Sequence, residues 1–274
     1  MKKEISWDHK RHETNGITPV CKNNKWGAIN KQGHVVVSPK WDFISWATRH
    51  NQVIVMQDGK FGVIDLDGNY IIPLGWDHIT FPSVFGCPPF DQGDFFEIRS
   101  LKNPVPLSSC YDDRRYELAN RECWNGLIDY RGTIIVEPKY DCISSIYDGG
   151  IVEIKKDNQW GAVNVIARSI LFEPMYEGLI PSQNGFFWMR KGSHKWGIIN
   201  SSNQVICKPQ WAGISGYRGS RYYRANRYGG WGVLQYDGKC VVDFIWDDVR
   251  INGEHFQGKK NKKWHIIDDP MTPQ

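Results

Sequence analysis

Acidic residues are the first candidates for chemistry in this 274-residue chain, because five of them directly follow an aromatic residue at a regular spacing. They are Asp42, Asp77, Asp141, Glu177 and Asp247, and the steps from Asp42 to Asp77 and from Asp141 to Glu177 are 35 and 36 residues. Paired carboxylates can act as general acid and base. A residue that returns at a fixed phase usually does the same structural work each time, so we expect these acids to cap turns and accept backbone hydrogen bonds.

Asp112 and Asp113 are stronger candidates for an enzyme, since no regular pattern requires them where they stand. Arg114 and Arg115 follow directly and give the segment a charged surface, which is more typical of a contact site than of a catalytic centre. An enzyme with its centre near Asp112 and Asp113 is therefore the third function hypothesis that the sequence supports.

The remaining residue types predict neither a metal centre nor a cofactor. His9 and His12 are three residues apart, but no cysteine or carboxylate stands beside them at ligand spacing. The glycines form no phosphate-binding loop, and no serine or cysteine stands in the motif of a known nucleophile. We expect a protein that is not an enzyme and that needs no metal and no cofactor.

Cysteine usage and hydropathy indicate where the chain works. The seven cysteines are scattered without a C-x-x-C pair, which fits free thiols in a reducing cytoplasm better than disulfides. No run of about 18 apolar residues is present, so we expect no membrane-spanning helix. The basic N-terminus lacks the apolar stretch of a secretory signal. We expect a cytoplasmic protein that does not contact a membrane.

An internal repeat organises the chain around a pair formed by an aromatic residue and a glycine. The pair occurs at Trp26-Gly27, Phe61-Gly62, Trp160-Gly161, Trp196-Gly197 and Trp231-Gly232, with degenerate copies at Asn125-Gly126 and Trp264-His265. The steps between successive copies are 35, 64, 35, 36, 35 and 33 residues. Spacing this regular predicts seven units of about 35 residues that are all built in the same way.

Each unit has the pattern of short β-strands joined by tight turns. Residues 52–56 and 150–154 are apolar runs of strand type, and Asp, Asn and Gly cluster between such runs. We expect the glycine of each aromatic-glycine pair to let a neighbouring ring approach the backbone. We also expect Pro39 and its counterparts to stop strand pairing. No stretch of helical period appears, so the sequence predicts an all-β fold.

These residues resemble the WG (or KWG) repeat family of bacterial proteins, whose units read K-W-G-[FVI]-I-[DN]-x-x-G-x-[IV]-[IV]-x-P-x-[YW]-[DE]. The best matches run from Lys25 to Asp42 and from Lys195 to Trp211. The resemblance covers nearly the whole chain apart from two insertions. It implies a scaffold found in varied bacterial settings, including secretion and conflict between bacteria, and it brings no catalytic motif.

The phase of the repeat at the two ends of the chain predicts how the units are arranged. Trp7-Asp8 looks like the end of a unit, and Trp264 begins one. A strand over Met1–Asp8 would complete the last unit and close a propeller-like ring of seven, which removes free sheet edges. The alternative is an open, curved β-solenoid. Either way we expect one WG-repeat domain over residues 1–274, with loop insertions at about 82–93 and 102–123 around a strand at Phe95–Ile98.

Charge and the aromatic residues outside the repeat phase point to a binding surface. From Phe186 to Trp264 the chain has 14 Lys or Arg and 5 Asp or Glu, an excess of +9 in a chain of net charge +4. Tyr and Arg dominate protein interfaces. We therefore predict that the partner is contacted by Tyr111, Arg114, Arg115, Tyr116, Arg221, Tyr223, Arg224 and Arg227.

These features favour a non-catalytic protein-binding module, in the specific form of a bacterial immunity or inhibitor protein. Such a protein would bind and block a partner toxin or enzyme, with its basic face against an acidic surface. The second hypothesis is a nucleic-acid or polyanion binder that uses the same face. A basic surface that only keeps sheet edges from aggregating would give the same charge pattern.

Overall fold

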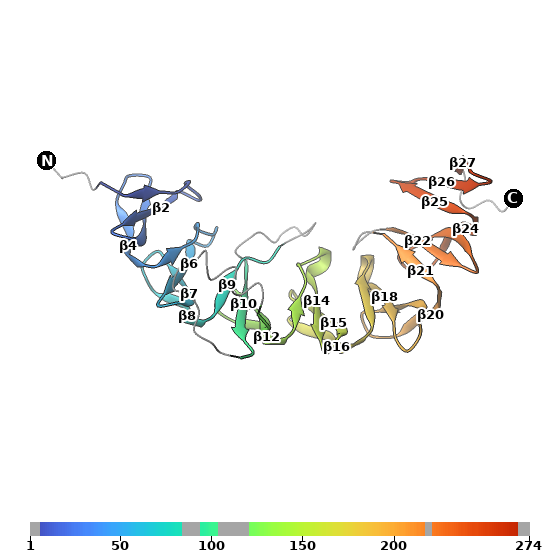
Figure 1. The fold of residues 1–274 in the computed structure, drawn as a ribbon, viewed down its shortest axis with the longest axis horizontal. Coiled ribbons are helices and arrows are strands. Elements are labelled where there is room, and N and C mark those ends of the chain that lie inside the picture. Colours follow the sequence, from blue (N-terminus) through green and yellow to red (C-terminus); the bar gives the residue numbers. More distant parts are fainter. Residues whose placement is uncertain (1–5, 84–93, 104–120, 217–220, 268–274) are drawn as a thin grey trace. The chain divides into compact units, whose positions relative to one another are not determined.

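The computed structural model describes residues 6–83, 94–103, 121–216 and 221–267, and this part of the chain is built almost wholly from β-strands (Figure 1). The strands form seven antiparallel sheets in chain order, six of four strands and a last one of three within the described residues. Two short 3-10 turns, η1 (Asp148–Gly150) and η2 (Gln183–Gly185), complete the described elements. The predicted all-β fold is confirmed. Among the described residues no helix is long and apolar enough to span a membrane.

Neighbouring strands within each sheet are also neighbours in sequence. The first three sheets contain β1 (His9–Lys10), β2 (Ile17–Lys22), β3 (Lys25–Asn30) and β4 (Val35–Trp41); β5 (Phe43–Ile44), β6 (Gln52–Gln57), β7 (Lys60–Asp65) and β8 (Tyr70–Trp76); and β9 (His78–Thr80), β10 (Phe95–Leu101), β11 (Cys123–Asp129) and β12 (Ile134–Tyr140). The strand predicted at Phe95–Ile98 therefore exists, as the first part of β10.

The last four sheets follow the same order. They contain β13 (Cys142–Ile143), β14 (Ile151–Lys156), β15 (Gln159–Asn164) and β16 (Ser169–Tyr176); β17 (Gly178–Pro181), β18 (Phe186–Arg190), β19 (Trp196–Asn200) and β20 (Val205–Trp211); β21 (Gly213–Ser215), β22 (Tyr222–Arg227), β23 (Gly230–Gln235) and β24 (Cys240–Trp246); and β25 (Asp248–Asn252), β26 (His255–Lys260) and β27 (Lys263–Ile267).

The described chain divides into two compact units, with the division between Ile143 and Ser144. The prediction of a single repeat domain over residues 1–274 stays a prediction. The repeat itself continues through both units with the same strand order.

Two kinds of tight turn build each sheet, and the sequence chemistry explains both. The second and third strands meet in two-residue turns such as Asn23-Asn24, Asp58-Gly59 and Asp157-Asn158, in which both residues have positive φ. That geometry matches the right-handed twist of a hairpin and favours Asn, Asp and Gly. Before the fourth strand, an Asx carboxylate or amide accepts backbone hydrogen bonds, as Asp65 Oδ1 does from the amides of Asp67 and Asn69. The predicted turns are confirmed.

The glycine of the aromatic-glycine pair has a different role from the one that we expected. A Cβ at Gly27 would lie 2.5 Å from the carbonyl oxygen of Val37, and one at Gly161 would lie 2.4 Å from that of Phe172. The fourth strand therefore presses its own backbone, not an aromatic ring, against this glycine. The register shifts at this point in every third–fourth strand pair of the described sheets, which marks a β-bulge.

The prolines after the bulge were predicted to stop strand pairing, and this prediction is wrong. Pro39 lies inside β4, and Trp41 beyond it still pairs with Trp26. The bulge explains this, because a proline that lacks an N–H donor is tolerated where the ladder of hydrogen bonds is already interrupted. Pairing resumes beyond the bulge and sets the two repeat-phased aromatics of one unit opposite each other.

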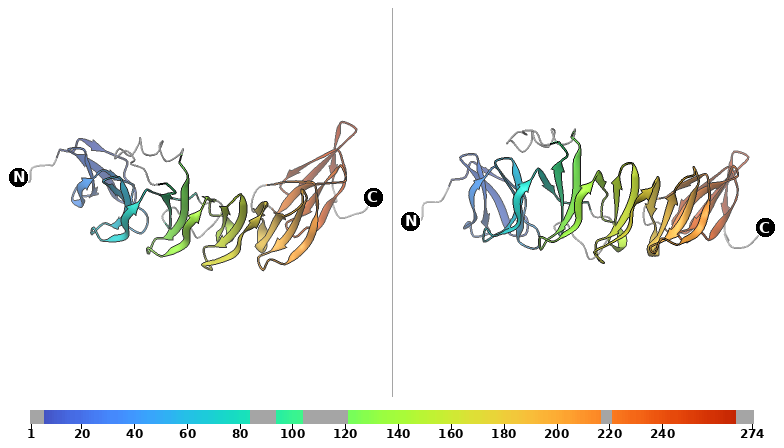
Figure 2. Two further views of the ribbon diagram at one scale, coloured as in Figure 1. Left: turned by 60° about the horizontal axis from the view of Figure 1, so that its bottom comes forward. Right: turned by 90° about the horizontal axis from the view of Figure 1, so that it is seen from below.

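Neighbouring sheets lie side by side within each compact unit (Figure 2), and apolar side chains pack between them. In the first unit, Phe61 and Val63 of the second sheet pack with Phe96 and Ile98 of the third. In the second unit, Trp188 and Trp211 of the fifth sheet pack with Tyr223 of the sixth. A single sheet could not bury these rings, so each sheet depends on its neighbour for a core.

The N-terminal strand pairs inside the first sheet. His9 and Lys10 of β1 lie opposite Cys21 and Val20 of β2. Residues 1–5, which belong to the strand predicted to close the ring, lie outside the described part of the chain. The choice between a closed ring and an open solenoid stays a prediction.

Replacing a repeat glycine by alanine should destabilise its sheet. A Cβ at Gly62 would lie 2.8 Å from the carbonyl oxygen of Ile72, so we expect Gly62→Ala to lower the free energy of unfolding in urea by about 2–3 kcal/mol. The control is Gly75→Ala in β8, where a Cβ would meet no atom within 4 Å. Equal stability of the two variants would show that the close backbone approach is not what requires glycine.

Candidate functional site

The binding residues predicted from the sequence fall into two groups. Tyr111, Arg114, Arg115 and Tyr116, like Asp112 and Asp113, lie outside the described residues, so their part in binding stays a prediction. Arg221, Tyr223, Arg224 and Arg227 belong to the sixth sheet and its approach. The structure places these four residues in three different surroundings.

Arg221 and Arg224 line a groove of the second compact unit, a hollow of about 1020 Å³ between the sixth and seventh sheets. One wall is formed by Arg221, Tyr222 and Arg224 at the start of β22, and the other by residues 250–255 at the turn between β25 and β26. Three arginines and one glutamate line it: Arg221, Arg224, Arg250 and Glu254. With histidine neutral, the lining therefore carries a charge of +2.

Glu254 connects the two walls of the groove. Its Oε1 accepts a hydrogen bond from Nη1 of Arg221 at 2.7 Å, and its Oε2 accepts one from the hydroxyl of Tyr222 at 3.0 Å. The Tyr222 ring packs edge-on against Phe256, with ring centroids 5.1 Å apart, so its hydroxyl is held in place. Burial, and then the hydrogen bond to the Glu254 carboxylate, raise the pKa of Tyr222.

The other two arginines of the groove lie over tryptophan rings of the aromatic-glycine positions. The guanidinium of Arg224 is 5.0 Å from the ring centroid of Trp231 and pairs with the carboxylate of Asp248. Its Nε is buried and has no hydrogen-bond acceptor among the described residues. Arg250 lies 3.9 Å from the ring centroid of Trp264, and no carboxylate of the described residues pairs with it. The sequence reasoning missed Arg250.

Tyr223 and Arg227 do not line the groove. Tyr223 is 1% exposed and packs against Trp188 with ring centroids 5.3 Å apart, so it is a core residue and its selection as a surface anchor was wrong. The strand period could have shown this, since Tyr223 and the apolar Ala225 share the inward face of β22. Arg227 ends the strand and lies over the ring of Tyr228.

A cation over the aromatic ring is a general feature of this repeat. Arg11 lies 4.0 Å from the ring centroid of Trp26, Lys155 lies 5.3 Å from that of Trp160, and Arg190 lies 5.3 Å from that of Trp196. Stacking of Arg224 and Arg250 on their tryptophans is therefore partly structural. What distinguishes the groove is that three guanidinium groups meet there on two neighbouring sheets.

Four of the five repeat-phased acids accept backbone hydrogen bonds, as predicted. Asp42 accepts a hydrogen bond from the amide of Asp58 at 2.8 Å, and Asp77 accepts one from the amide of Leu101 at 2.9 Å. Glu177 and Asp247 accept from Gly192 and Asn261 in the same way. Each acid thus supports the hairpin of the second and third strands in the next sheet. A ring of catalytic acids is not needed to explain them.

A second hollow of about 450 Å³ lies in the first compact unit, beside the third repeat, which departs from the common pattern. Asn125 stands where other units have an aromatic ring, and its Nδ2 donates to the carbonyl oxygens of Cys123, Tyr140 and Asp141. A small buried amide thus replaces a ring. The walls carry both signs of charge, including an ion pair between Lys102 and Asp141 at 2.5 Å. Balanced charge gives this hollow no clear ligand class.

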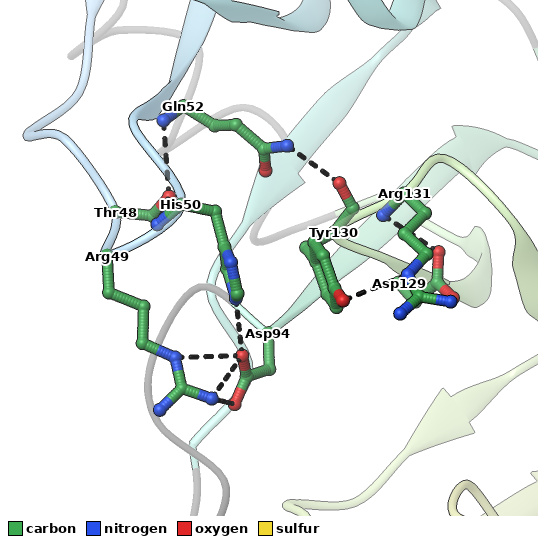
Figure 3. Close-up of polar contacts among 8 residues, drawn as sticks. All are labelled: Thr48, Arg49, His50, Gln52, Asp94, Asp129, Tyr130 and Arg131. Carbon is green, nitrogen blue, oxygen red and sulfur yellow. Dashed lines mark hydrogen bonds and ion pairs between the residues drawn. The ribbon is translucent and has the colours of Figure 1, made fainter.

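A third polar cluster joins the loop before β6 to the start of β10 (Figure 3). Asp94, whose side chain is 6% exposed, accepts hydrogen bonds from Nη2 of Arg49 at 2.6 and 2.5 Å, and its Oδ1 lies 2.7 Å from Nε2 of His50. The His50 ring stacks on Tyr130 at 3.9 Å, and Gln52 donates to the carbonyl oxygen of Tyr130. Sequence reasoning did not identify this cluster.

A histidine oriented by a carboxylate is the usual arrangement of a general base. Within the described residues, no serine, threonine or cysteine side chain hydrogen-bonds the His50 ring. The contacts of this cluster instead fasten the second sheet to the third. The described residues also contain no group of three or more histidine, cysteine or acidic side chains placed to hold a metal ion.

Removing the charge of Asp94 should loosen this connection. We expect Asp94→Asn to lower the free energy of unfolding by about 1–2 kcal/mol, because a buried carboxylate that is bound by the Arg49 guanidinium and the His50 ring is replaced by a neutral amide. The value is modest because Arg49 is 44% exposed and can be hydrated. The control is Asp67→Asn at an exposed turn position, which should unfold like the wild type. A wild-type midpoint for Asp94→Asn would contradict the structural role.

Several solved structures are weakly similar to this chain. The chain is similar in fold to a crystal structure of the eukaryotic initiation factor, with 7% identity and a TM-score of 0.41 over 93% of this chain and 76% of that chain. It is similar to Kluyveromyces lactis Hsv2p, with 7% identity and a TM-score of 0.31 over 83% of this chain and 74% of that one. BamB from Moraxella catarrhalis gives 10% identity and a TM-score of 0.32 over 89% and 76%.

These structural likenesses are too weak to say anything about function. No curated protein matches the sequence. Residues 26–61 and 126–160 match the family model of the WG containing repeat. The family resemblance seen in the sequence is thereby confirmed, and the chain carries WG-type β-repeats.

Proposed function

We propose that this chain is a non-catalytic binding module that holds an acidic segment of a partner protein in the groove between its sixth and seventh sheets. The observation that carries the proposal is the meeting of Arg221, Arg224 and Arg250 around a hollow of about 1020 Å³. Guanidinium groups bind carboxylates through paired hydrogen bonds, and arginine and tyrosine are the residues most often found at the centre of interfaces.

The size and construction of the groove support a peptide segment as the ligand. About 1020 Å³ is at the upper end of the range for small-molecule sites, and several residues of an extended chain would fill it. Both walls come from hairpin strands packed on a common apolar cluster that includes Val249 and Phe256. A rigid wall reduces the entropy lost on binding.

The more specific form of the proposal is an inhibitor. A module that occupies an acidic surface of a toxin or enzyme blocks it sterically and needs no chemistry of its own. We propose that the chain acts in this way as a bacterial immunity protein in the cytoplasm. The excess of positive charge between Phe186 and Trp264 would speed its encounter with an acidic target.

Nucleic acid is the second candidate ligand, because the same positive charge would attract phosphates. Two observations favour the protein ligand. Arg221 and Arg224 already pair with the carboxylates of Glu254 and Asp248 in this structure. In addition, Arg224 and Arg250 lie over the rings of Trp231 and Trp264, so these rings are poor platforms for stacked bases.

The test is capture of a partner by tagged protein from host lysate, with and without nuclease. We expect one protein to be retained after nuclease treatment, and retention to fall at least about tenfold for the Arg221→Ala/Arg250→Ala variant, because two interface arginines are removed. The purified partner should lose its activity when the wild-type chain is added and keep it when the variant is added.

The matched control is Lys208→Ala/Lys239→Ala, which removes two positive charges from exposed positions of the second unit outside the groove. It should retain the partner like the wild type. Recovery of nucleic acid alone would contradict the proposal and favour the polyanion binder. Equal losses in both double variants would show that general charge, not the groove, holds the partner.

A further inference from the structure

We infer that Glu254 is an internal occupant of a carboxylate subsite, and that an acidic side chain of the partner takes its place. This inference rests on the proposed function of the groove and names the chemistry that the groove recognises. The ligand class is an acidic peptide segment with at least two carboxylates. The first carboxylate replaces Glu254, and the second pairs with Arg250.

The contacts of Glu254 define the subsite. Its two carboxylate oxygens are bound by two different groups, Nη1 of Arg221 at 2.7 Å and the hydroxyl of Tyr222 at 3.0 Å. The guanidinium also lies over the Tyr222 ring, 5.1 Å from its centroid. Arg221 and Tyr222 thus form a fixed pair of donors whose spacing suits the two oxygens of one carboxylate.

Glu254 is held weakly enough to be displaced. It lies with Gly253 in the turn between Asn252 and His255, and Gly253 has a φ of 63°. The side chains of Glu254 and Arg221 are 65% and 51% exposed. An ion pair this exposed contributes little to stability, so its exchange for a partner carboxylate costs little free energy. The neighbouring pair of Arg224 and Asp248 is less exposed and stays in place.

The rest of the groove supplies the second contact. Arg250 pairs with no carboxylate of the described residues, and the tryptophan beneath it fixes its guanidinium. On the same wall as Arg221, the Nε of Arg224 is a buried donor without an acceptor among the described residues. The groove thus has one cationic position on each wall. Arg221 is occupied by Glu254, and Arg250 is paired with no described carboxylate. An acidic segment that crosses the groove could bind both.

The experiment titrates a labelled hexaglutamate peptide into wild-type protein, Glu254→Gln and Glu137→Gln at fixed, low ionic strength. Glu137→Gln is the matched control, because it makes the same charge change at an exposed position of the first unit. We expect Glu254→Gln to bind the peptide about two- to fivefold more tightly, since an exposed internal competitor is removed. Glu137→Gln should bind like the wild type.

Two further variants separate competition from a general gain in positive charge. In an Arg221→Ala background, Glu254→Gln should give no gain, because Glu254 then no longer competes for Arg221. An equal gain in both backgrounds would overturn the internal-occupant inference. The inference would also be overturned if Glu254→Gln bound the peptide no better than Glu137→Gln while Arg221 and Arg250 were still necessary for binding.

Failure of the proposed function itself would look different. Wild-type protein and Arg221→Ala/Arg250→Ala would then bind hexaglutamate equally or not at all. Inorganic phosphate and a short single-stranded oligothymidine serve as competitors at the same ionic strength. Displacement of hexaglutamate by the oligonucleotide at lower concentration than by unlabelled hexaglutamate would overturn the assignment of an acidic peptide.

Discussion

The close approach of a fourth-strand carbonyl to the glycine of each aromatic-glycine pair is the contact on which the rest of this structure depends. In the six described sheets that have a fourth strand, a Cβ at this glycine would lie 2.4 to 2.8 Å from a backbone oxygen of that strand. No side chain fits such a gap. The bulge that results sets the two phased aromatic residues opposite each other, as Trp26 and Trp41 show. The aromatic residue nearer the end of the unit then packs into the core between sheets, where Trp41 is 1% exposed.

The seventh repeat differs from the others at the glycine position. It has His265 where the others have glycine, and within the described residues its sheet stops at three strands. A fourth strand in the register of the other six sheets would place a carbonyl oxygen against the Cβ of His265. A strand that completed this sheet would have to pair in a different register.

Much of this fold could be predicted, because its determinants are local. Turn residues such as Asn23 and Asn24 adopt positive φ at little cost, and Asx side chains bond amides two and four residues away. The candidate site was harder to predict. Arg250 joins Arg221 and Arg224 only because two sheets pack side by side, and nothing near it in sequence marks it. Asp94 meets Arg49 and His50 across about 45 residues that follow no repeat phase. Tyr223 was misplaced because its residue type was weighed above its position in the strand.

The repeat also limits where a function can be located. The phased aromatic residues, glycines and acids of the repeat have structural roles. Cationic side chains above the tryptophan rings also recur from sheet to sheet. Only positions that vary between units are free to recognise something else. Arg221 and Glu254 are of this kind, since neither lies over an aromatic-glycine ring nor caps a repeat hairpin. Their meeting with Arg250 between two neighbouring sheets produces a groove that no single unit could form. Under the proposed function, specificity therefore arises from the differences between the repeats, on a scaffold that their similarities build.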